Sequence, residues 1–353
     1  MEPFVYQAVP MRIVFGHGSA AQLGDETDGL GLTRILVLST PGRRGLAEEL
    51  SAGLGRRVVG IHARARMHVP AVTVDAAQQA ALQARADGLL AVGGGSTTGL
   101  AKGVALVTGL PIVAVPTTYS GSEATPIWGI TDNGAKRTGR DQRVLPRTVV
   151  YDPDLSRALP LDIAGPSAVN ALAHCVEALY AGDANPITLL MAEEGIRALA
   201  GALEGMAHNA GDPEPRARAL YGAWLAGTSL AAVRMSLHHK LCHVLGGSFD
   251  LPHSEVHTVI LPYALAYNAA AAPEAYARIQ SALGSEDASR RIQSLAGAVG
   301  APRSLDELGM RGEDLDRAAA LAAQDSYGNP APVTQAGVKR LLERAFTGEE
   351  PVC

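Results

Sequence analysis

Histidines are concentrated in one short part of this sequence. Five of the ten histidines fall between positions 238 and 257, where HHKLCHVLGG is followed by DLPHSEVH. Residues four apart share one face of a helix, so His239 and His243 form a pair there. Asn170 and His174, in NALAHCVE, form a second pair at the same spacing. His253 follows a proline, and we expect it to lie in a loop that turns back toward these pairs.

These side chains predict an inward-facing cluster with a chemical task. A single histidine is more often a structural or surface residue, but burying several imidazoles is costly unless they have a function. The set could hold a divalent metal, or it could handle protons and negative charge in a reaction. His238 and His257 flank the set and are expected to support it. The other histidines are interpreted as structural or surface residues: His17, His62, His68 and His208.

A second candidate site begins at the glycine-rich stretch GGGSTTGLAK, residues 93–102. It follows a predicted strand and opens a predicted helix, so Gly94 and Gly95 would let backbone amides approach a phosphate closely. Ser96 and Thr97 add hydroxyl groups at the same helix start. Because the pattern differs from the G-x-G-x-x-G fingerprint, by itself it fits phosphate binding and a tight turn equally well.

The next predicted strand ends in the hydroxyl-rich loop VPTTYSGSEAT, residues 115–125. Its Thr117, Thr118 and Ser120 should emerge beside the glycine turn, because the carboxyl ends of parallel strands meet at one edge. Two such loops on adjacent strands predict a nucleotide site. Ser39 ends the first clear strand, where an acidic residue would bond the ribose of NAD. With no acid there, both NADH and NADPH stay open as cofactors.

The elements that must position these residues differ between the two halves of the chain. Short apolar runs predict strands at 34–39, 58–63, 88–94, 111–116 and 148–152. Helical patterns at 74–86 and 97–108 lie between them, which predicts a Rossmann-like parallel sheet covered by helices. From Ala164 onward the spacing is helical, at 168–181, 187–203, 216–235, 275–283, 288–299 and 336–346. We expect an NAD(P)-binding α/β domain over 1–157 and an all-helical substrate domain over 158–353.

Composition narrows the class of protein further. The 353 residues are 47% hydrophobic and 18% charged, which fits a well-packed globular protein. A net charge of −5 gives no reason to expect nucleic acid or an acidic membrane surface as a partner. Three scattered cysteines predict no disulfide framework and a reducing, cytoplasmic location. The N-terminus does not read as a signal peptide, and no apolar run is long enough to span a membrane.

The chain resembles the iron-containing alcohol dehydrogenase superfamily in GGGSTTGLAK, VPTTYSGSE, the NALAH pair, HHKLCHVLGG with DLPH, and ILPYALAYN. Within it, the chain is similar to the maleylacetate reductases in VLPRTVVYDPDL, ANPITLLMAEEGIRALA and ALYGAWLAGTSL. The likeness runs over nearly the whole chain. It implies a dehydroquinate-synthase-like fold, with an α/β nucleotide domain followed by a helical domain, and a homodimer or larger assembly.

In metal-using members of the superfamily, a divalent ion is held by an Asp, the His four residues later and two further histidines. The matching positions here are Asn170, His174, His239 and His253. The Asp has become Asn, so the set loses its only anionic ligand and gains an amide, a poor ligand for Fe(II) or Zn(II). We therefore expect a degenerate site without a tightly bound metal, which the likeness to maleylacetate reductases also implies.

The resemblance implies NAD(P)H-dependent reduction of the carbon–carbon double bond of maleylacetate to 3-oxoadipate, a step in aromatic-compound degradation. Hydride addition to this conjugated enone places charge on an enolate oxygen, which hydrogen-bond donors can stabilise. His243, whose superfamily counterpart lies close to the nicotinamide, is the expected proton donor. His239 and His253 would orient the substrate and stabilise the enolate, with His174 in support. Further candidates for substrate contacts are Lys240, which could instead face solvent, Asn170 and Ser120.

Other functions remain open at this point. A metal-dependent alcohol dehydrogenase or aldehyde reductase of the same superfamily, with Asn170 as a working ligand, would lose activity with a chelator. A cyclase or lyase on the related scaffold would use NAD transiently and consume no NADH overall. A binding protein without catalysis fits less well, because both nucleotide loops and all four histidines are retained. For the leading function, the expected partners are a small dicarboxylate and a second copy of the chain.

Overall fold

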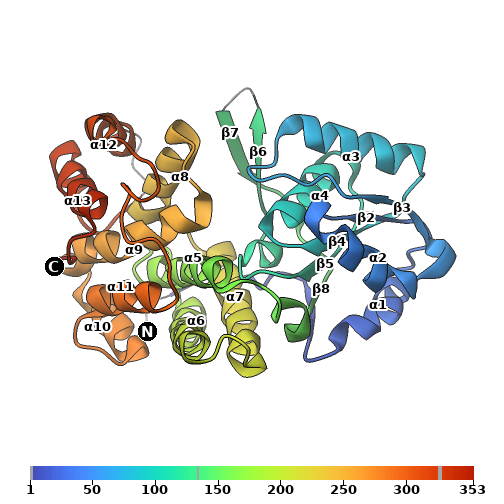
Figure 1. The fold of residues 1–353 in the computed structure, drawn as a ribbon, viewed down its shortest axis with the longest axis horizontal. Coiled ribbons are helices and arrows are strands. Elements are labelled where there is room, and N and C mark those ends of the chain that lie inside the picture. The colour runs from blue at the N-terminus through green and yellow to red at the C-terminus, as the bar shows by residue number, and fades with distance from the viewer. Residues whose placement is uncertain (1–2, 133–134, 325–327) are drawn as a thin grey trace. The chain divides into compact units, whose positions relative to one another are not determined.

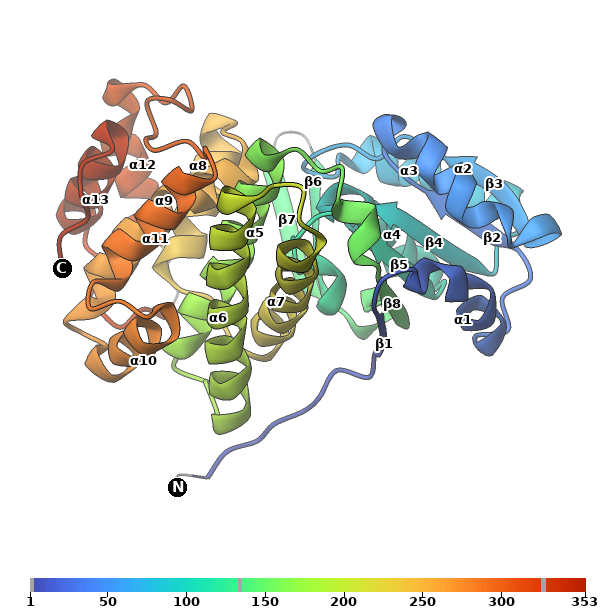
Figure 2. The ribbon, with the colours of Figure 1, turned by 60° about the horizontal axis from the view of Figure 1, so that its bottom comes forward.

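The chain folds as two compact units in this computed structural model, which describes residues 3–132, 135–324 and 328–353. One unit is Val9–Leu159, and the other is Pro160–Cys353 together with the N-terminal segment as far as Ala8. The α/β unit thus ends at Leu159 rather than at the expected residue 157. The extended N-terminal segment (Figure 2) belongs with the helices. Pro10 lies two residues before the first strand, and its missing N–H disfavours continued pairing toward the N-terminus.

The α/β unit is built on six parallel strands in the order β1–β8–β5–β4–β2–β3 (Figure 1). They are β1 (Arg12–Phe15), β2 (Ile35–Leu38), β3 (Val58–His62), β4 (Gly88–Gly93), β5 (Ile112–Pro116) and β8 (Thr148–Tyr151). The predicted fold class and all five predicted strands are confirmed. Every residue of β2, β4, β5 and β8 is buried, as expected of parallel strands that are covered on both faces.

The helices of this unit follow the strands in sequence. They are α1 (Leu23–Gly29), α2 (Arg44–Ala52), α3 (Ala71–Gln83) and α4 (Gly95–Thr108). α3 and α4 confirm the two helices predicted from periodicity. α4 begins within the glycine turn itself, at Gly95, and packs against β4 and β5. Its first residues therefore lie at the edge where these two strands end.

Sequence patterns missed two features of the α/β unit. β1 is an edge strand with exposed Arg12 and Phe15, so it lacks the continuous apolar run that marks a central strand. The hairpin of β6 (Ile127–Asp132) and β7 (Ala135–Arg140) forms a separate two-stranded sheet rich in polar residues. Gly139 leaves room for the Trp128 ring, since a Cβ there would lie 2.7 Å from it.

In the part of Pro160–Cys353 that the structure describes, every regular element is helical (Figures 1 and 2). The α-helices are α5 (Leu161–Leu179), α6 (Pro186–His208), α7 (Pro213–Ala232), α8 (Leu237–Phe249), α9 (His253–Ala269), α10 (Pro273–Leu283), α11 (Ala288–Ala298), α12 (Leu315–Ala323) and α13 (Gln335–Thr347). The predicted helical segments are all confirmed. α5 is buried over most of its length and packs against α6, α7 and α9.

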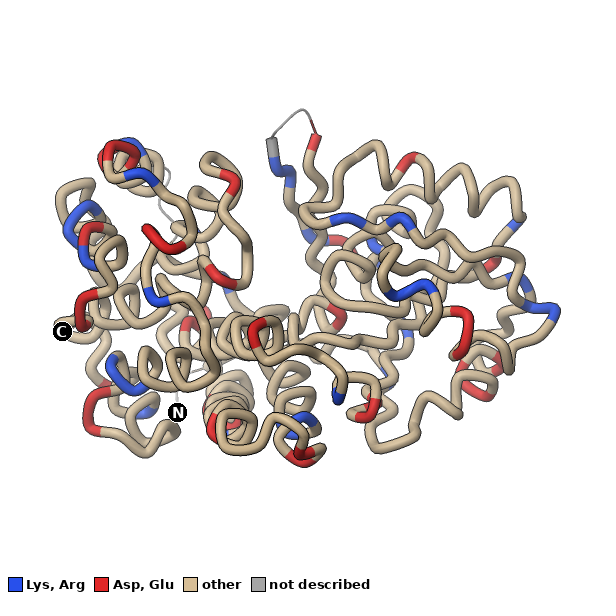
Figure 3. Tube along the Cα trace, viewed as in Figure 1, with Lys and Arg blue, Asp and Glu red and all other residues tan. Residues whose placement is uncertain are grey.

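Charged side chains of both signs are interspersed along the helices of each unit (Figure 3). Ion pairs such as Lys339–Asp316 and Arg290–Glu350 join neighbouring surface segments. Interspersed charges of this kind carry little binding specificity of their own. Among the described helices, none has an apolar stretch long enough to cross a bilayer.

Candidate active site

Histidine rings from three helices meet inside the helical unit, where α9 packs against both α5 and α8. The ring centroids of His174 and His239 lie 5.0 Å apart, and those of His239 and His257 are also 5.0 Å apart. The His253 and His257 rings are closer, at 4.4 Å. The structure thus brings the histidines of NALAH, HHKLCH and DLPHSEVH into one cluster: His174, His238, His239, His243, His253 and His257.

One local prediction about this cluster was wrong. His253 does not lie in a loop but is the first residue of α9, directly after Pro252 in an extended conformation. Proline is well accepted at a helix start because its missing N–H has no partner there in any case. His253 and His257 are therefore one turn apart on α9 and enter the cluster from the same helix.

A buried carboxylate, which the sequence reasoning missed, underlies the cluster. Glu177 on α5 is fully buried, and its Oε2 lies 2.6 Å from Nδ1 of His239. Oε2 also accepts the backbone N–H of Ser236 at 2.9 Å, and Oε1 accepts that of His238 at 2.8 Å. Because a carboxylate with two backbone donors is an acceptor, we place the His239 proton on Nδ1. Glu177 lies three residues after His174 on α5, and that spacing was the available signal.

Burial controls the protonation of this cluster. Burial and, after it, the neighbouring His239 lower the pKa of His238 to about 4, although Glu177 opposes the shift. Burial, followed by the nearby histidines, also holds the pKa values of His174 and His257 well below the usual range. These three imidazoles are therefore neutral near pH 7. Burial raises the pKa of Glu177, and hydrogen bonds from the backbone of α8 oppose that rise.

The outer members of the cluster reach the surface. His243, His253 and Lys240 are half-buried, unlike the inner histidines. The His243 ring centroid is 6.4 Å from that of His239. A half-buried imidazole can exchange its proton with solvent, whereas the buried ones cannot do so without an opening motion. His243 and His253 are thus the histidines of the cluster that can exchange a proton with solvent.

Several buried polar atoms in the cluster have no hydrogen-bond partner among the described residues. They are Oδ1 of Asn170, Nδ1 of His174, Nδ1 of His238 and both ring nitrogens of His257. An unsatisfied buried polar group costs about 1–3 kcal/mol, so such atoms are rare and seldom gather in one place. Their concentration indicates a site that a ligand, an ion or water completes.

In the α/β unit, the two predicted nucleotide loops touch one another where β4 and β5 end. A Cβ on Gly94 would lie 2.7 Å from Oγ1 of Thr118, and one on Gly95 would lie 3.4 Å from Ser120. Gly93 has φ +151°, and a Cβ there would meet Thr97 at 2.4 Å. The glycines are required because the second loop packs directly against the backbone of the first.

The predicted cofactor residues lie at two depths. The partly exposed ones at the strand edge are Gly94, Gly95, Ser96, Thr118 and Ser120. The fully buried ones beneath them are Ser39, Thr97 and Thr117. The first group can meet a phosphate, while the second shapes the loops that present it. The N-terminus of α4 adds a favourable dipole for an anion.

Lys102 in α4 anchors the end of the hydroxyl-rich loop through hydrogen bonds to its backbone. The sequence reasoning did not assign this role. The Lys102 side chain is 1% exposed, and its ammonium donates to the carbonyl oxygens of Ser122, Thr125 and Ile127 at 2.6, 2.8 and 2.7 Å. Burial lowers its pKa to about 7, and nearby Glu123 opposes that shift. The ammonium thereby ties α4 to the segment between β5 and β6.

Glu123 is the acidic member of the same buried network. It accepts a hydrogen bond from the Tyr151 hydroxyl at 2.9 Å and one from Ser120 at 3.2 Å. Burial raises its pKa, while these hydrogen bonds and Lys102 oppose the rise. The network therefore links the partly exposed Ser120 to the rigid end of β8.

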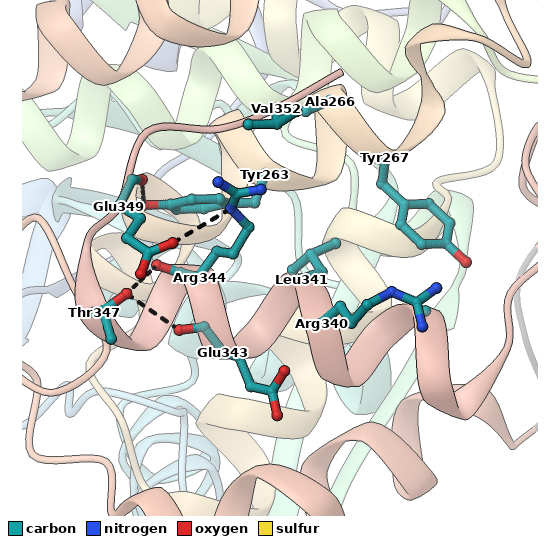
Figure 4. Close-up of a pocket in the computed structure, with 11 residues that line it drawn as sticks. Tyr263, Ala266, Tyr267, Arg340, Leu341, Glu343, Arg344, Thr347, Glu349 and Val352 are labelled. Carbon is teal, nitrogen blue, oxygen red and sulfur yellow. Dashed lines mark hydrogen bonds and ion pairs between the residues drawn. The ribbon is translucent and has the colours of Figure 1, made fainter.

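A separate pocket of about 640 Å³ opens between α9 and α13 (Figure 4). Part of its polar lining is engaged within the protein: Arg344 faces Glu349 at 3.7 Å, and the Tyr263 hydroxyl donates to the Glu349 carbonyl at 2.6 Å. None of the predicted site residues lines it. We therefore locate the candidate chemistry at the histidine cluster.

Comparison with known proteins agrees with both halves of this description. The model of the iron-containing alcohol dehydrogenase family matches residues 10–153, and that of the Fe-containing alcohol dehydrogenase family, C-terminal, matches residues 165–346. A maleylacetate reductase from Burkholderia cepacia is 52% identical, over 99% of this chain and 100% of its own. One from Sphingobium indicum is 51% identical, over 99% of both chains. The crystal structure of maleylacetate reductase from Agrobacterium tumefaciens, 48% identical, superposes with a TM-score of 0.95 over 99% of this chain and 100% of that chain.

Proposed function

Because this chain belongs to the iron-containing alcohol dehydrogenase family, and its relatives at about half identity are maleylacetate reductases, we propose that it is one too. It reduces the carbon–carbon double bond of maleylacetate with NADH or NADPH and forms 3-oxoadipate. The observation that carries this function is the histidine cluster around Glu177, which offers N–H donors to a developing enolate.

The reaction moves two electrons and two hydrogens. Hydride from the reduced nicotinamide adds to the alkene carbon that is β to the ketone, and the π electrons move onto the ketone oxygen. His239 and His253 orient the substrate, and an N–H of His253 stabilises this enolate oxygen, with His174 in support. His243 then gives a proton to the α carbon, and NAD(P)⁺ leaves. Glu177 keeps His239 oriented through its hydrogen bond at 2.6 Å.

Substrate and cofactor use different groups. Lys240, Asn170 and Ser120 are the candidates for contacts with the substrate. The cofactor phosphates meet the start of α4 and the hydroxyl-rich loop, while Ser39, in place of an acid, leaves the choice between NADH and NADPH open. We further propose a homodimer that acts in the cytoplasm on a small dicarboxylate. Light scattering of the purified protein tests the dimer.

The iron named in the family's description does not fit its usual positions well in this chain. Asn170, His174, His239 and His253 offer an amide and three imidazoles, with no carboxylate among them. Oδ1 of Asn170 is buried without a partner among the described residues, but a neutral amide oxygen is a poor ligand for Fe(II). We therefore derive no step of the reaction through a metal at these four positions.

The decisive experiment is NADH and NADPH consumption with maleylacetate, using protein treated with a chelator and assayed for residual metal. Substrate-dependent oxidation without metal, with 3-oxoadipate as the product, supports the proposal. If activity returns only with Fe(II) or Zn(II), the metal-free mechanism is wrong. If maleylacetate is inert in both cases, the alternative is a metal-dependent alcohol dehydrogenase or aldehyde reductase, which a panel of aldehydes would reveal.

A further inference from the structure

We propose that His238, His239 and His257 form a binding site for one divalent transition metal ion, such as Zn(II) or Co(II). This site shares only His239 with the four positions that the family would use. It does not depend on which substrate the enzyme reduces.

The first observation is the grouping of donor atoms. One ring nitrogen from each of these three side chains lies within 4.8 Å of those of the other two, and all three residues are buried. No other group of three such donors occurs among the described residues. A tetrahedral ion with metal–nitrogen bonds of about 2.0–2.1 Å holds its donor atoms about 3.3–3.4 Å apart, so the three rings must draw closer together to bind it.

The second observation is the pair of hydrogen bonds that orient two of the rings. His239 donates from Nδ1 to the Glu177 carboxylate at 2.6 Å, and His238 bonds the backbone carbonyl of His257 through Nε2 at 3.0 Å. A histidine that ligates a metal usually donates its other ring N–H to a carboxylate or a carbonyl. Both bonds fix the tautomer and leave the opposite nitrogen with a lone pair for an ion.

The third observation is the buried polar atoms that remain unmatched. Nδ1 of His238 and both nitrogens of His257 have no hydrogen-bond partner among the described residues. If these positions served only to pack the core, apolar residues of similar size would fill them at a lower cost in folding free energy. Nδ1 of His238 is the nitrogen that its hydrogen bond leaves available, so the unmatched atoms include the predicted ligand.

The two ligand sets differ in chemistry as well as in place. The set of His238, His239 and His257 is all imidazole, which suits Zn(II), Co(II) and Cu(II). Three protein ligands leave a fourth position open on a tetrahedral ion. The sequence predicted that no metal is tightly held, and a metal at these three histidines would differ from that prediction. Asn170 is not a ligand in either case.

The test is binding of Co(II) to chelator-treated full-length protein, followed through the visible ligand-field absorption of the ion and through metal content per chain. We expect one ion per chain in a tetrahedral spectrum. Loss of a residue that only hydrogen-bonds a metal ligand typically weakens metal binding by about 10–100-fold. His238→Asn and His257→Asn each remove a ligand, so they should weaken Co(II) binding by more than this. Glu177→Gln should fall within that range.

The matched controls are His174→Asn and Asn170→Ala, which alter buried members of the family's ligand set and spare the proposed one. They should leave Co(II) affinity and spectrum unchanged. Loss of binding in these controls, with retention in His238→Asn and His257→Asn, would place the ion at the family's positions and overturn the proposal. Absence of bound Co(II) in the wild type would overturn it as well.

Because a buried variant can fail to fold, the wild type also provides a direct readout. Crystals soaked with Co(II) should show an anomalous peak bonded to His238, His239 and His257. A peak bonded to His174 and His253 instead, or no peak in the helical unit, would contradict the proposed site. Circular dichroism of each variant separates lost binding from lost folding.

Discussion

Each unit of this protein buries a polar network, and the two networks differ in how completely they are satisfied. In the α/β unit, Lys102 donates to three carbonyl oxygens, and Glu123 accepts from Tyr151 and Ser120. In the helical unit, Glu177 is equally well supplied with donors, but nitrogens of His174, His238 and His257 have no hydrogen-bond partner in the part of the chain that the structure describes.

This difference separates polar groups that hold structure from polar groups that await a partner. A fully satisfied network rigidifies its surroundings, and here it fixes a loop at the nucleotide edge. An unsatisfied cluster lowers stability, so its retention points to a task that offsets the cost. Substitutions in the first network should therefore affect mainly folding, and those in the second mainly activity.

The largest expected effect is on catalysis, from His243→Gln. Removing the proposed proton donor should lower kcat by about 10²–10⁴-fold, because general acid catalysis contributes that much. The unfolding midpoint should change little, since His243 is half-buried. Steady-state kinetics with maleylacetate and a thermal melt provide the two readouts. An unchanged kcat would assign the proton to another group.

Next in size is the effect of Lys102→Met on stability. The substitution leaves Glu123 buried without its cation and three carbonyl oxygens without a donor. Breaking one partner of a buried ionic network costs about 3–5 kcal/mol. Urea denaturation measures this loss. Lys136→Met in the β6–β7 hairpin is the control, and an equal loss there would show that the buried network is not special.

Acidification should destabilise the histidine cluster specifically. The pKa of His238 is about 4 in the folded protein and 6.5 for an ordinary histidine, so the unfolded chain binds the extra proton between these values. The contribution of His238 to the free energy of unfolding is thus fully present above pH 6.5. This contribution, about 3 kcal/mol, is lost as the pH falls toward 4. Denaturation of metal-free wild type and His238→Asn across this range should show a smaller pH slope in the variant.

A smaller effect is expected from Glu177→Gln. The amide keeps one acceptor oxygen for the backbone of α8, but it cannot accept from all three donors that Glu177 serves. Loss of a partner that orients a catalytic histidine should reduce kcat by about 10–100-fold. Glu177→Asp should recover part of the activity if the charge matters. Equal activity in both variants and the wild type would remove Glu177 from the mechanism.

The smallest effect should come from Tyr151→Phe. It removes one hydrogen bond to Glu123 and leaves the ammonium of Lys102 in place. The expected cost is about 1–2 kcal/mol of folding free energy, with kcat nearly unchanged. A loss as large as that of Lys102→Met would mean that Tyr151, rather than the lysine, holds the network together.

Much of the fold could be predicted from the sequence because its signals are local. Buried strands of the six-stranded sheet are continuous apolar runs, so five of its strands were found. The edge strand at Arg12 and the polar hairpin of β6 and β7 were not. The contact between the glycine turn and the hydroxyl-rich loop could also be predicted, because the carboxyl ends of neighbouring parallel strands lie at the same edge of the sheet. The placement of Lys102 could not, since a lysine on a helix usually faces solvent.

The sequence by itself determined the two-part architecture, the nucleotide loops, the enrichment in histidine and the replacement of a ligand carboxylate by Asn170. These depend on residue type and on spacing along one element. Only the tertiary structure decided that His238 and His257 are central, that His253 begins a helix, and that Glu177 joins α5 to α8. The physical reason is that a helix carries side chains on every face, and only its packing partners decide which face is buried and which donors meet.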